Sequence, residues 1–299
     1  MTGKIPRRYP LDQSPIFRVR GKGVLANLLH VGPKALDAFA AGDPAHYDEF
    51  DIEGSRPGKV RHIEAPREDL KVTQRRLSQL LMRIEPPDFL FCPVKRRDFL
   101  SNAARHVGAR IVWTIDVKSY FERTESWKVE QFFLKQMQCL PDLAAILRKL
   151  TTFNGHLPTG SPASPILAYF ANMEMWLEIE GICLAHGCVI SVYMDDLTVS
   201  GSSVPWSLRA AVKKALKRNG FVGHKEETFK GVPARITGGV ARAADLDLPN
   251  AFYRRRREKL EQARLEGDDS SKALSALRGM GSLKKLMLQR RKAAALSLA

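Results

Sequence analysis

The chain is organised around the stretch Gly187–Gly201, which reads GCVISVYMDDLTVSG. Two runs rich in β-branched residues, 189–192 and 197–200, flank a short polar tip, and this pattern predicts a β-hairpin. The tip places Asp195 next to Asp196, and two carboxylates at contact distance repel each other. A hard divalent cation such as Mg²⁺ prefers carboxylate oxygens and would offset this repulsion. A solvated acidic turn is the alternative interpretation of the same pair.

The composition bounds the class of protein. The chain has 299 residues, 44% of them hydrophobic, which is enough for two or three packed subregions. Its formal net charge of +16 indicates a polyanionic partner, most often nucleic acid. An anionic membrane is the weaker alternative, because no basic amphipathic helix stands alone at a terminus. No apolar run approaches the ~20 residues of a membrane span, and residues 1–8 lack the apolar core of a signal peptide. We therefore expect a cytoplasmic protein with no membrane partner.

The four cysteines, Cys92, Cys139, Cys183 and Cys188, form no C-x-x-C pair. Cys183, His186 and Cys188 are close in sequence, but a fourth ligand at zinc-site spacing is missing. Buried free thiols in a reducing compartment are the favoured interpretation.

Apolar periodicity predicts alternating helices and strands along the chain. Before the hairpin these are a broken helical leader over 1–54, a strand over 59–66, a helix over 70–81, a short helix over 101–106 capped by Ser101 or Asn102, a strand over 110–115, a helix from 124–126 onward and a long apolar helix over 166–182. After the hairpin these are a helix over 204–218, a short hairpin region from Lys225, a glycine-interrupted strand over 235–240 and a basic helical segment from Ala251.

The last sixth of the chain is strongly basic. Residues 251–299 hold 13 Lys or Arg and 5 Asp or Glu, which gives a net charge of +8. The densest point is Arg254–Arg257. A solvated helix face is one interpretation, and a surface that follows nucleic-acid phosphates is the favoured one.

A third carboxylate accompanies the pair at the hairpin tip. Asp116 follows the strand over 110–115, and such a residue can meet Asp195 and Asp196 at one edge of an antiparallel sheet. Three carboxylates there could hold two Mg²⁺ ions ~3.5–4 Å apart. One ion would lower the pKa of a 3′-hydroxyl, and the other would hold a nucleoside triphosphate. Phosphoryl transfer needs this charge clamp and little covalent chemistry.

Four blocks of the sequence resemble the reverse transcriptase family and occur in that family's order over about residues 59–240. Tyr193–Asp196 resembles the Y-x-D-D signature, and Asp116–Phe121 resembles the first catalytic block. Leu157–Pro165 resembles the template-and-nucleotide loop L-P-Q-G-x-x-x-S-P, with Thr159 in place of the usual Gln. Arg61-x-Ile63-x-x-Pro66 resembles the fingers block.

Two further blocks resemble hallmarks of bacterial retron reverse transcriptases. Asn102–His106 matches N-A-x-x-H, and Ile236–Gly238 is close to V-T-G. The resemblance implies an α+β, right-hand polymerase fold with antiparallel sheet in the palm. It implies a helical leader over 1–54, fingers over 55–108 and 124–156, a palm over 109–123 and 157–240, and a basic helical thumb over 241–299.

The resemblance also implies site residues. Asp116, Asp195 and Asp196 would be the catalytic carboxylates that bind two Mg²⁺ ions, with the Val117 main-chain carbonyl as a further ligand. Contacts with the incoming deoxynucleoside triphosphate would come from Arg61, Phe121, Gly160, Ser161 and Lys225. Contacts with RNA would come from Asn102, His106, Arg254, Arg255, Arg256 and Arg257.

Several of these implied roles have plainer alternatives. Phe121 would be the steric gate that rejects a 2′-hydroxyl, or it could be a core residue. Arg61, with Lys59, would contact the triphosphate. Lys225 would lie near the leaving pyrophosphate as a proton donor, or it could be an ordinary surface lysine.

The loop and the retron motif also leave alternatives open. Gly160 and Ser161 would let the backbone approach the nascent base pair. With Thr159 in the loop, we expect nucleotide contacts there to be shorter or bridged by water. Asn102 and His106 would support either a specific RNA or the local fold.

The resemblance implies RNA-templated DNA synthesis on a cognate structured noncoding RNA, primed from an RNA 2′-hydroxyl, with the cDNA product remaining bound. It also implies a part in antiphage defence together with a separate effector protein. Two rivals remain. One is another bacterial reverse transcriptase, such as a group II intron relative or a different defence polymerase. The other is a catalytically idle RNA-binding scaffold with the same fold.

Overall fold

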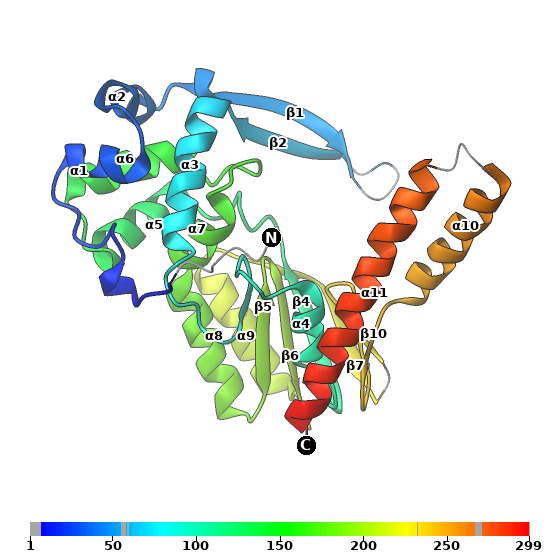
Figure 1. The fold of residues 1–299 in the computed structure, drawn as a ribbon. Helices are drawn as coiled ribbons and strands as arrows, with labels where there is room; N and C mark the ends of the chain where they lie inside the picture. The colour runs from blue at the N-terminus through cyan, green and yellow to red at the C-terminus, as the bar shows by residue number, and fades with distance from the viewer. Residues whose placement is uncertain (1–6, 55–57, 59, 232, 267–270, 299) are drawn as a thin grey trace. The chain divides into compact units, whose positions relative to one another are not determined.

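A computed structural model describes residues 7–54, 58, 60–231, 233–266 and 271–298. Its helices and strands form two compact units, each built from segments that are far apart in the sequence (Figure 1). Unit 1 consists of Met1–Pro87, Lys118–Glu178 and Ala215–Val222. Unit 2 consists of Asp88–Val117, Ile179–Lys214 and Gly223–Ala299. Within the described ranges, no helix is both long and apolar enough to cross a membrane.

Unit 1 is mainly helical. Its elements are η1 Leu11–Gln13, α1 Lys22–Leu29, α2 Pro33–Ala41, η2 Pro44–His46, β1 Tyr47–Glu53, β2 Val60–Pro66, α3 Glu68–Leu81, α5 Ser126–Gln131, the π-helical turn η3 Phe132–Gln136, α6 Pro141–Thr151, α7 Ser164–Ala171 and the start of α8 Met173–Ala185. The predicted amphipathic helix is α3, which buries Leu70, Leu77 and Leu81 on one face and contacts α1, α6 and α7. Burial of each leucine contributes about 2 kcal/mol.

The strands of unit 1 form a two-stranded antiparallel ribbon, β1–β2. Tyr47 pairs with Pro66 at one end and Glu53 with Val60 at the other. β1 corrects the prediction of a helical leader over 1–54, because the last part of that leader is a strand. Its sequence, YDEFDIE, has few apolar residues, so pairing with β2 rather than core burial defines it.

Unit 2 is built on a five-stranded sheet with the order β3-β5-β6-β4-β7. Its strands are β3 Leu90–Cys92, β4 Ile111–Val117, β5 Val189–Tyr193, β6 Asp196–Gly201 and β7 Gly223–Lys230. β3 runs parallel to β5, and all other neighbours are antiparallel. β4 lies inside the sheet, which accounts for its β-branched and aromatic composition, and Trp113 is fully buried.

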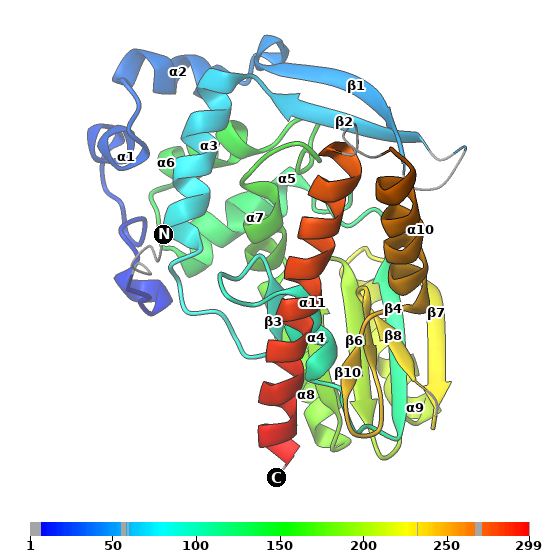
Figure 2. The same cartoon turned by 45° about the vertical axis from the view of Figure 1, so that its right-hand side comes forward.

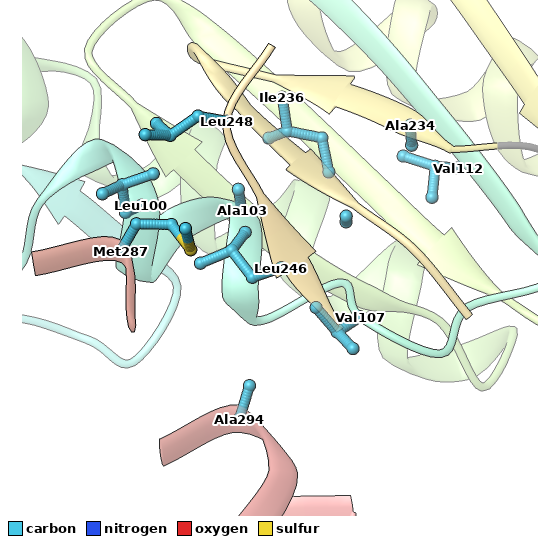
Figure 3. Packing of buried hydrophobic residues seen from close by; sticks show 11 residues of the cluster. Leu100, Ala103, Val107, Val112, Ala234, Ile236, Leu246, Leu248, Met287 and Ala294 are labelled. Carbon is cyan, nitrogen blue, oxygen red and sulfur yellow. The ribbon is translucent and has the colours of Figure 1, made fainter. Parts of the chain in front are cut away.

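The rest of unit 2 combines helices with a small sheet of order β10-β9-β8 (Figure 2). These elements are α4 Phe99–Ala104, the first part of α9 Trp206–Arg218, β8 Ala234–Ile236, β9 Gly239–Ala241, β10 Leu246–Asp247, α10 Asn250–Glu266 and α11 Ser271–Leu298. Leu100 of α4, Leu246 of β10 and Met287 of α11 belong to one apolar cluster (Figure 3). Gly239 permits this packing, because a Cβ there would lie 2.7 Å from the Ala103 Cβ.

The structure confirms the α+β class and the β-hairpin over 189–201. The long apolar helix predicted over 166–182 is wrong, because the chain breaks at Asn172 into α7 and α8. The Asn172 side-chain amide donates to the Thr124 Oγ1 at 3.0 Å and to the Ala168 carbonyl at 2.9 Å. These bonds hold the residue outside helical geometry.

Three other local predictions are also corrected. α4 is capped by Asp98, not Ser101 or Asn102, and Asp98 and Ser101 form a reciprocal capping box. Lys225 does not open a hairpin but lies within β7, which pairs with β4. The segment over 235–240 is two antiparallel strands, because Thr237 and Gly238 both have positive φ, as a tight hairpin turn requires.

Candidate active site

The hairpin tip is formed by the two residues between β5 and β6. Tyr193 pairs with Asp196, which leaves Met194 and Asp195 as the loop. Met194 has φ +62°, the left-handed geometry that two-residue hairpins use. The Val117 amide donates to the Asp195 carbonyl at 2.8 Å and fixes the tip to the end of β4.

The sheet register brings the three predicted aspartates to one edge of unit 2. Asp116 on β4 is the direct cross-strand partner of Asp196 on β6. The pKa of Asp196 is raised from 3.8 to about 6, chiefly by burial and then by the charges of Asp195 and Asp116, against the lowering effect of Lys225. The aspartates therefore form one electrostatic group, as the sequence predicts.

Asp116 is held by two basic side chains from β7. Its Oδ1 lies 2.9 Å from the His224 Nδ1, and its Oδ2 accepts a hydrogen bond from the Lys225 Nζ at 3.2 Å. A register irregularity between Thr114 and Asp116 in the β4–β7 pairing accompanies this contact. Lys225 is thus no isolated surface lysine. His224 was missed by the sequence reasoning, although its position directly before Lys225 is the signal that could have found it.

The donor set at this edge fits a hard divalent cation. Three carboxylates supply only oxygen ligands, and the pKa of Asp196 is raised by burial and by the neighbouring carboxylates despite the opposing charge of Lys225. The proposed part of the Val117 carbonyl stays a prediction.

The predicted nucleotide contacts Arg61 and Phe121 belong to unit 1. Arg61 is exposed on β2, opposite Ile52. Phe121 is half-buried, with its ring 6.1 Å from that of Tyr120, so it is not a core residue. Lys59 lies outside the described residues.

The loop with Gly160 and Ser161 packs on β2 in unit 1. The Gly160 amide donates to the Glu64 carbonyl at 2.9 Å, and a Cβ on Gly160 would lie 2.7 Å from that oxygen. The Ser161 hydroxyl is buried and donates to the Gln74 Oε1 at 2.6 Å. Thr159, which replaces the usual Gln, donates its hydroxyl to the His62 carbonyl at 3.2 Å. These residues therefore fix the loop to β2, a function that the sequence reasoning did not foresee.

The N-A-x-x-H residues are both buried in unit 2. The His106 imidazole lies between two hydroxyls, with Nδ1 2.7 Å from the Ser200 Oγ and Nε2 2.7 Å from the Ser191 Oγ. Burial lowers the pKa of His106 from 6.5 to about 3, with a smaller effect from the charge of Arg105. Asn102 is fully buried and donates to the Thr237 Oγ1 at 3.1 Å. This environment favours the alternative in which the motif supports the local fold.

The basic run Arg254–Arg257 lies on α10. Arg254, Arg255 and Arg257 are exposed, and Arg256 is half-buried. Arg255 also lines a mostly apolar cavity of about 630 Å³ in unit 2, together with Phe252. The predicted free thiols are confirmed: all four cysteines are free, and Cys92 is the one that is not fully buried.

This α+β fold, with antiparallel sheets and a hairpin of paired aspartates, fits the polymerase class. Residues 50–226 match the family described as "Reverse transcriptase (RNA-dependent DNA polymerase)". The match covers more than half of the chain, and the chain belongs to this family. The resemblance stated from the sequence blocks is therefore confirmed.

Several relatives are bacterial retron reverse transcriptases. The chain is 27% identical over 177 residues to the Retron Se72 reverse transcriptase of Salmonella heidelberg (strain 579083-10), covering 59% of this chain and 47% of that protein. It is 29% identical over 219 residues to the Retron Mx65 reverse transcriptase of Myxococcus xanthus, and the match covers 64% of this chain and 50% of that protein. It is 26% identical over 259 residues to the Retron Ec86 reverse transcriptase of Escherichia coli, and the match covers 82% of this chain and 81% of that protein. The chain thus spans about half the length of the first two.

Proposed function

We propose that the chain is an RNA-directed DNA polymerase that copies part of a cognate structured noncoding RNA into single-stranded DNA. This proposal rests on one observation: the sheet register places Asp116, Asp195 and Asp196 at one edge of the sheet. All three lie inside the segment 50–226 that matches the family. An idle scaffold would have no need of three carboxylates at one edge, where burial and the charges of Asp195 and Asp116 both raise the pKa of Asp196.

The chemistry follows from these residues. Asp116, Asp195 and Asp196, with the Val117 carbonyl, would hold two Mg²⁺ ions. When bound, these ions lower the pKa of the attacking hydroxyl and neutralise the triphosphate. Lys225, which already donates a hydrogen bond to Asp116, would give a proton to the leaving pyrophosphate. Arg61 would contact the triphosphate, which an exposed guanidinium on a strand can do.

The subdomains and the partners belong to the same proposal. We assign a leader to 1–54, fingers to 55–108 and 124–156, a palm to 109–123 and 157–240 and a thumb to 241–299. The similarity to retron reverse transcriptases supports priming from an RNA 2′-hydroxyl, a cDNA that stays bound, a cytoplasmic location and a role in antiphage defence with a separate effector.

Primer extension with the full chain, a primed RNA template, deoxynucleotides and Mg²⁺ tests the polymerase. DNA products are expected. If no RNA template gave DNA products, the result would favour the catalytically idle RNA-binding scaffold. Sequencing of copurifying nucleic acid tests the retron part. The expected molecule is one structured RNA joined to DNA that a 2′–5′ debranching enzyme releases. If DNA synthesis started only from the 3′ end of a separate primer, the result would favour the alternative of a group II intron relative.

The variant F121A is expected to admit ribonucleotides. A half-buried aromatic ring that packs under the sugar would exclude a 2′-hydroxyl by contact, and such discrimination is worth about 10- to 200-fold. The ratio of kcat/KM for deoxynucleotides and ribonucleotides should fall by this factor. The matched control is Y120F, which removes a hydroxyl bonded to the Ala168 carbonyl and should leave the ratio unchanged. An unaltered ratio in F121A would remove the gate assignment.

Replacing Arg254–Arg257 by four glutamines is expected to weaken RNA binding and flatten its salt dependence. Each lost phosphate contact lowers the magnitude of the slope of log K against log salt by about 0.7–0.9, so the loss of four contacts should lower it by up to about 3.6. Filter binding over a series of KCl concentrations measures this slope. Four lysines at the same positions keep the charge and should keep the slope. An equal slope in the parent and the glutamine variant would show that Arg254–Arg257 form a solvated helix face that does not contact RNA phosphates.

A further inference from the structure

A second cluster of potential metal ligands lies on the β1–β2 ribbon of unit 1. Antiparallel pairing places Glu49 opposite Glu64 and Asp51 opposite His62, so all four side chains share one face. Among the residues that the structure describes, Glu49, His62 and Glu64 offer ligand atoms that all lie within 4.8 Å of one another. This spacing is small enough for one cation to reach all three.

Groups around the triad hold two of the ligands in place. The His62 Nε2 faces the Glu49 Oε2 at 3.1 Å, while its Nδ1 lies 2.9 Å from the Asp51 Oδ1. Metal-binding histidines commonly donate the opposite ring N–H to a carboxylate, which fixes the tautomer. Glu64 is 4% exposed, and its Oε2 lies 3.0 Å from the His156 Nε2. The triad therefore has the outer hydrogen bonds that metal sites use.

The charge of this face also favours a cation. Within the described part of the chain, the ion pairs of Glu49, Asp51 and Glu64 are made with histidines and not with Lys or Arg. The concentration of carboxylates contrasts with the net charge of +16 of the whole chain. An imidazole in the donor set selects a transition metal such as Zn²⁺ over Mg²⁺ or Ca²⁺.

We propose that Glu49, His62 and Glu64 bind one Zn²⁺-type transition metal ion, with Asp51 orienting His62. Three protein ligands with a fourth position for water match a common zinc arrangement. The ion joins β1 to β2, because Glu49 comes from one strand and His62 and Glu64 come from the other. The three ligands are separate from the residues that we assign to the polymerase site. Its effect is to stiffen the ribbon whose opposite face carries Arg61.

Calorimetric titration of the D195N/D196N variant of this chain with ZnCl₂ tests the proposal. This background removes two of the aspartates of unit 2, so that metal binding there does not contribute to the signal. One equivalent is expected to bind, and MgCl₂ at the same concentrations should not replace it. In this background H62A should lose the site, E49Q should bind at least tenfold more weakly, and D51N about 10- to 100-fold more weakly. The matched controls are E53Q, on the same ribbon face but outside the triad, and the exposed histidine variant H186A; both should bind like the background.

Hydrogen exchange of β1 and β2 gives a second readout. Zn²⁺ should slow exchange in the ribbon of the background protein and of E53Q, but not of H62A, with equal circular dichroism for all three. Absent uptake, uptake that H62A leaves unchanged, or equal uptake of Mg²⁺ would each overturn the site. Such a result would leave His62 as an ion-pair partner of Glu49 and Asp51. It would leave the polymerase proposal unaffected, because the tested background lacks the Asp195–Asp196 pair on which that proposal depends.

Discussion

The variant D195N/D196N is expected to lose DNA synthesis on a primed RNA template, with kcat reduced by about 10³-fold or more. Both residues lie at the β5–β6 turn, where Asp196 pairs across the sheet with Asp116. Asparagine keeps the side-chain shape but removes the charge that binds a divalent cation. Several kcal/mol of charge stabilisation are lost, and about 1.4 kcal/mol corresponds to a tenfold change in rate. Single-turnover primer extension measures this loss.

A stability measurement separates this effect from misfolding. The pKa of Asp196 is raised on folding to about 6 from 3.8, chiefly by burial. A carboxyl with a raised pKa opposes folding at pH values above its unfolded pKa, by on the order of 3 kcal/mol once the pH exceeds 6. The single variant D196N should therefore raise the urea midpoint at pH 7, and this gain should disappear as the pH falls toward 4.

The matched control for both measurements is D142N, in the exposed first turn of α6. It should extend primers and unfold like the parent. RNA binding by D195N/D196N should not weaken, because no cationic contact is removed. Primer extension by D195N/D196N at the parental rate would contradict the catalytic assignment.

Local patterns account for the parts of this fold that the sequence predicts well. The hairpin at Asp195 follows from β-branched runs around a tip, and α3 follows from apolar spacing. Both patterns lie within a short window, so no distant partner is needed to recognise them. The aspartate group was predictable for a related reason, because Asp116 stands at the end of a strongly β-forming segment.

Features that depend on distant partners could not be predicted. Asn172 breaks the predicted long helix through a bond to Thr124, which lies 48 residues away. Gly160 is required because the backbone of β2 passes within 2.7 Å of its would-be Cβ, a contact across 96 residues of sequence that no local pattern reports. The motif residue His106 depends on two serines on the strands of the hairpin. In each case tertiary contacts decide the local structure.

The cluster at His62 shows the same limit within a single ribbon. Glu49 and Glu64 become neighbours only when β1 pairs with β2 in the observed register. A shift by one residue would turn one strand's ligands to the opposite face. Because β1 itself was not predicted, the cluster could not be predicted from the sequence.

The variant H106Q is expected to remove much of the acid sensitivity of the folded protein. In the parent the pKa of His106 falls on folding from 6.5 to about 3, because burial excludes the charged imidazolium. A depressed pKa gives stability that is complete above the unfolded pKa of 6.5 and is lost as the pH falls toward 3. The loss approaches on the order of 5 kcal/mol at the lower end of this window. Urea unfolding followed by tryptophan fluorescence at pH 7, 5 and 4 measures the change.

At pH 7 the same variant should be less stable than the parent. His106 satisfies the hydroxyls of Ser191 and Ser200, which share one face of the β5–β6 hairpin. Glutamine has one amide to serve both, and each buried hydroxyl left unpaired costs about 1–3 kcal/mol. The unfolding free energies of parent and variant should therefore converge as the pH falls from 6.5. The exposed histidine variant H186Q should follow the parent at every pH, and a parallel decline of H106Q with the parent would show that His106 does not link the fold to pH.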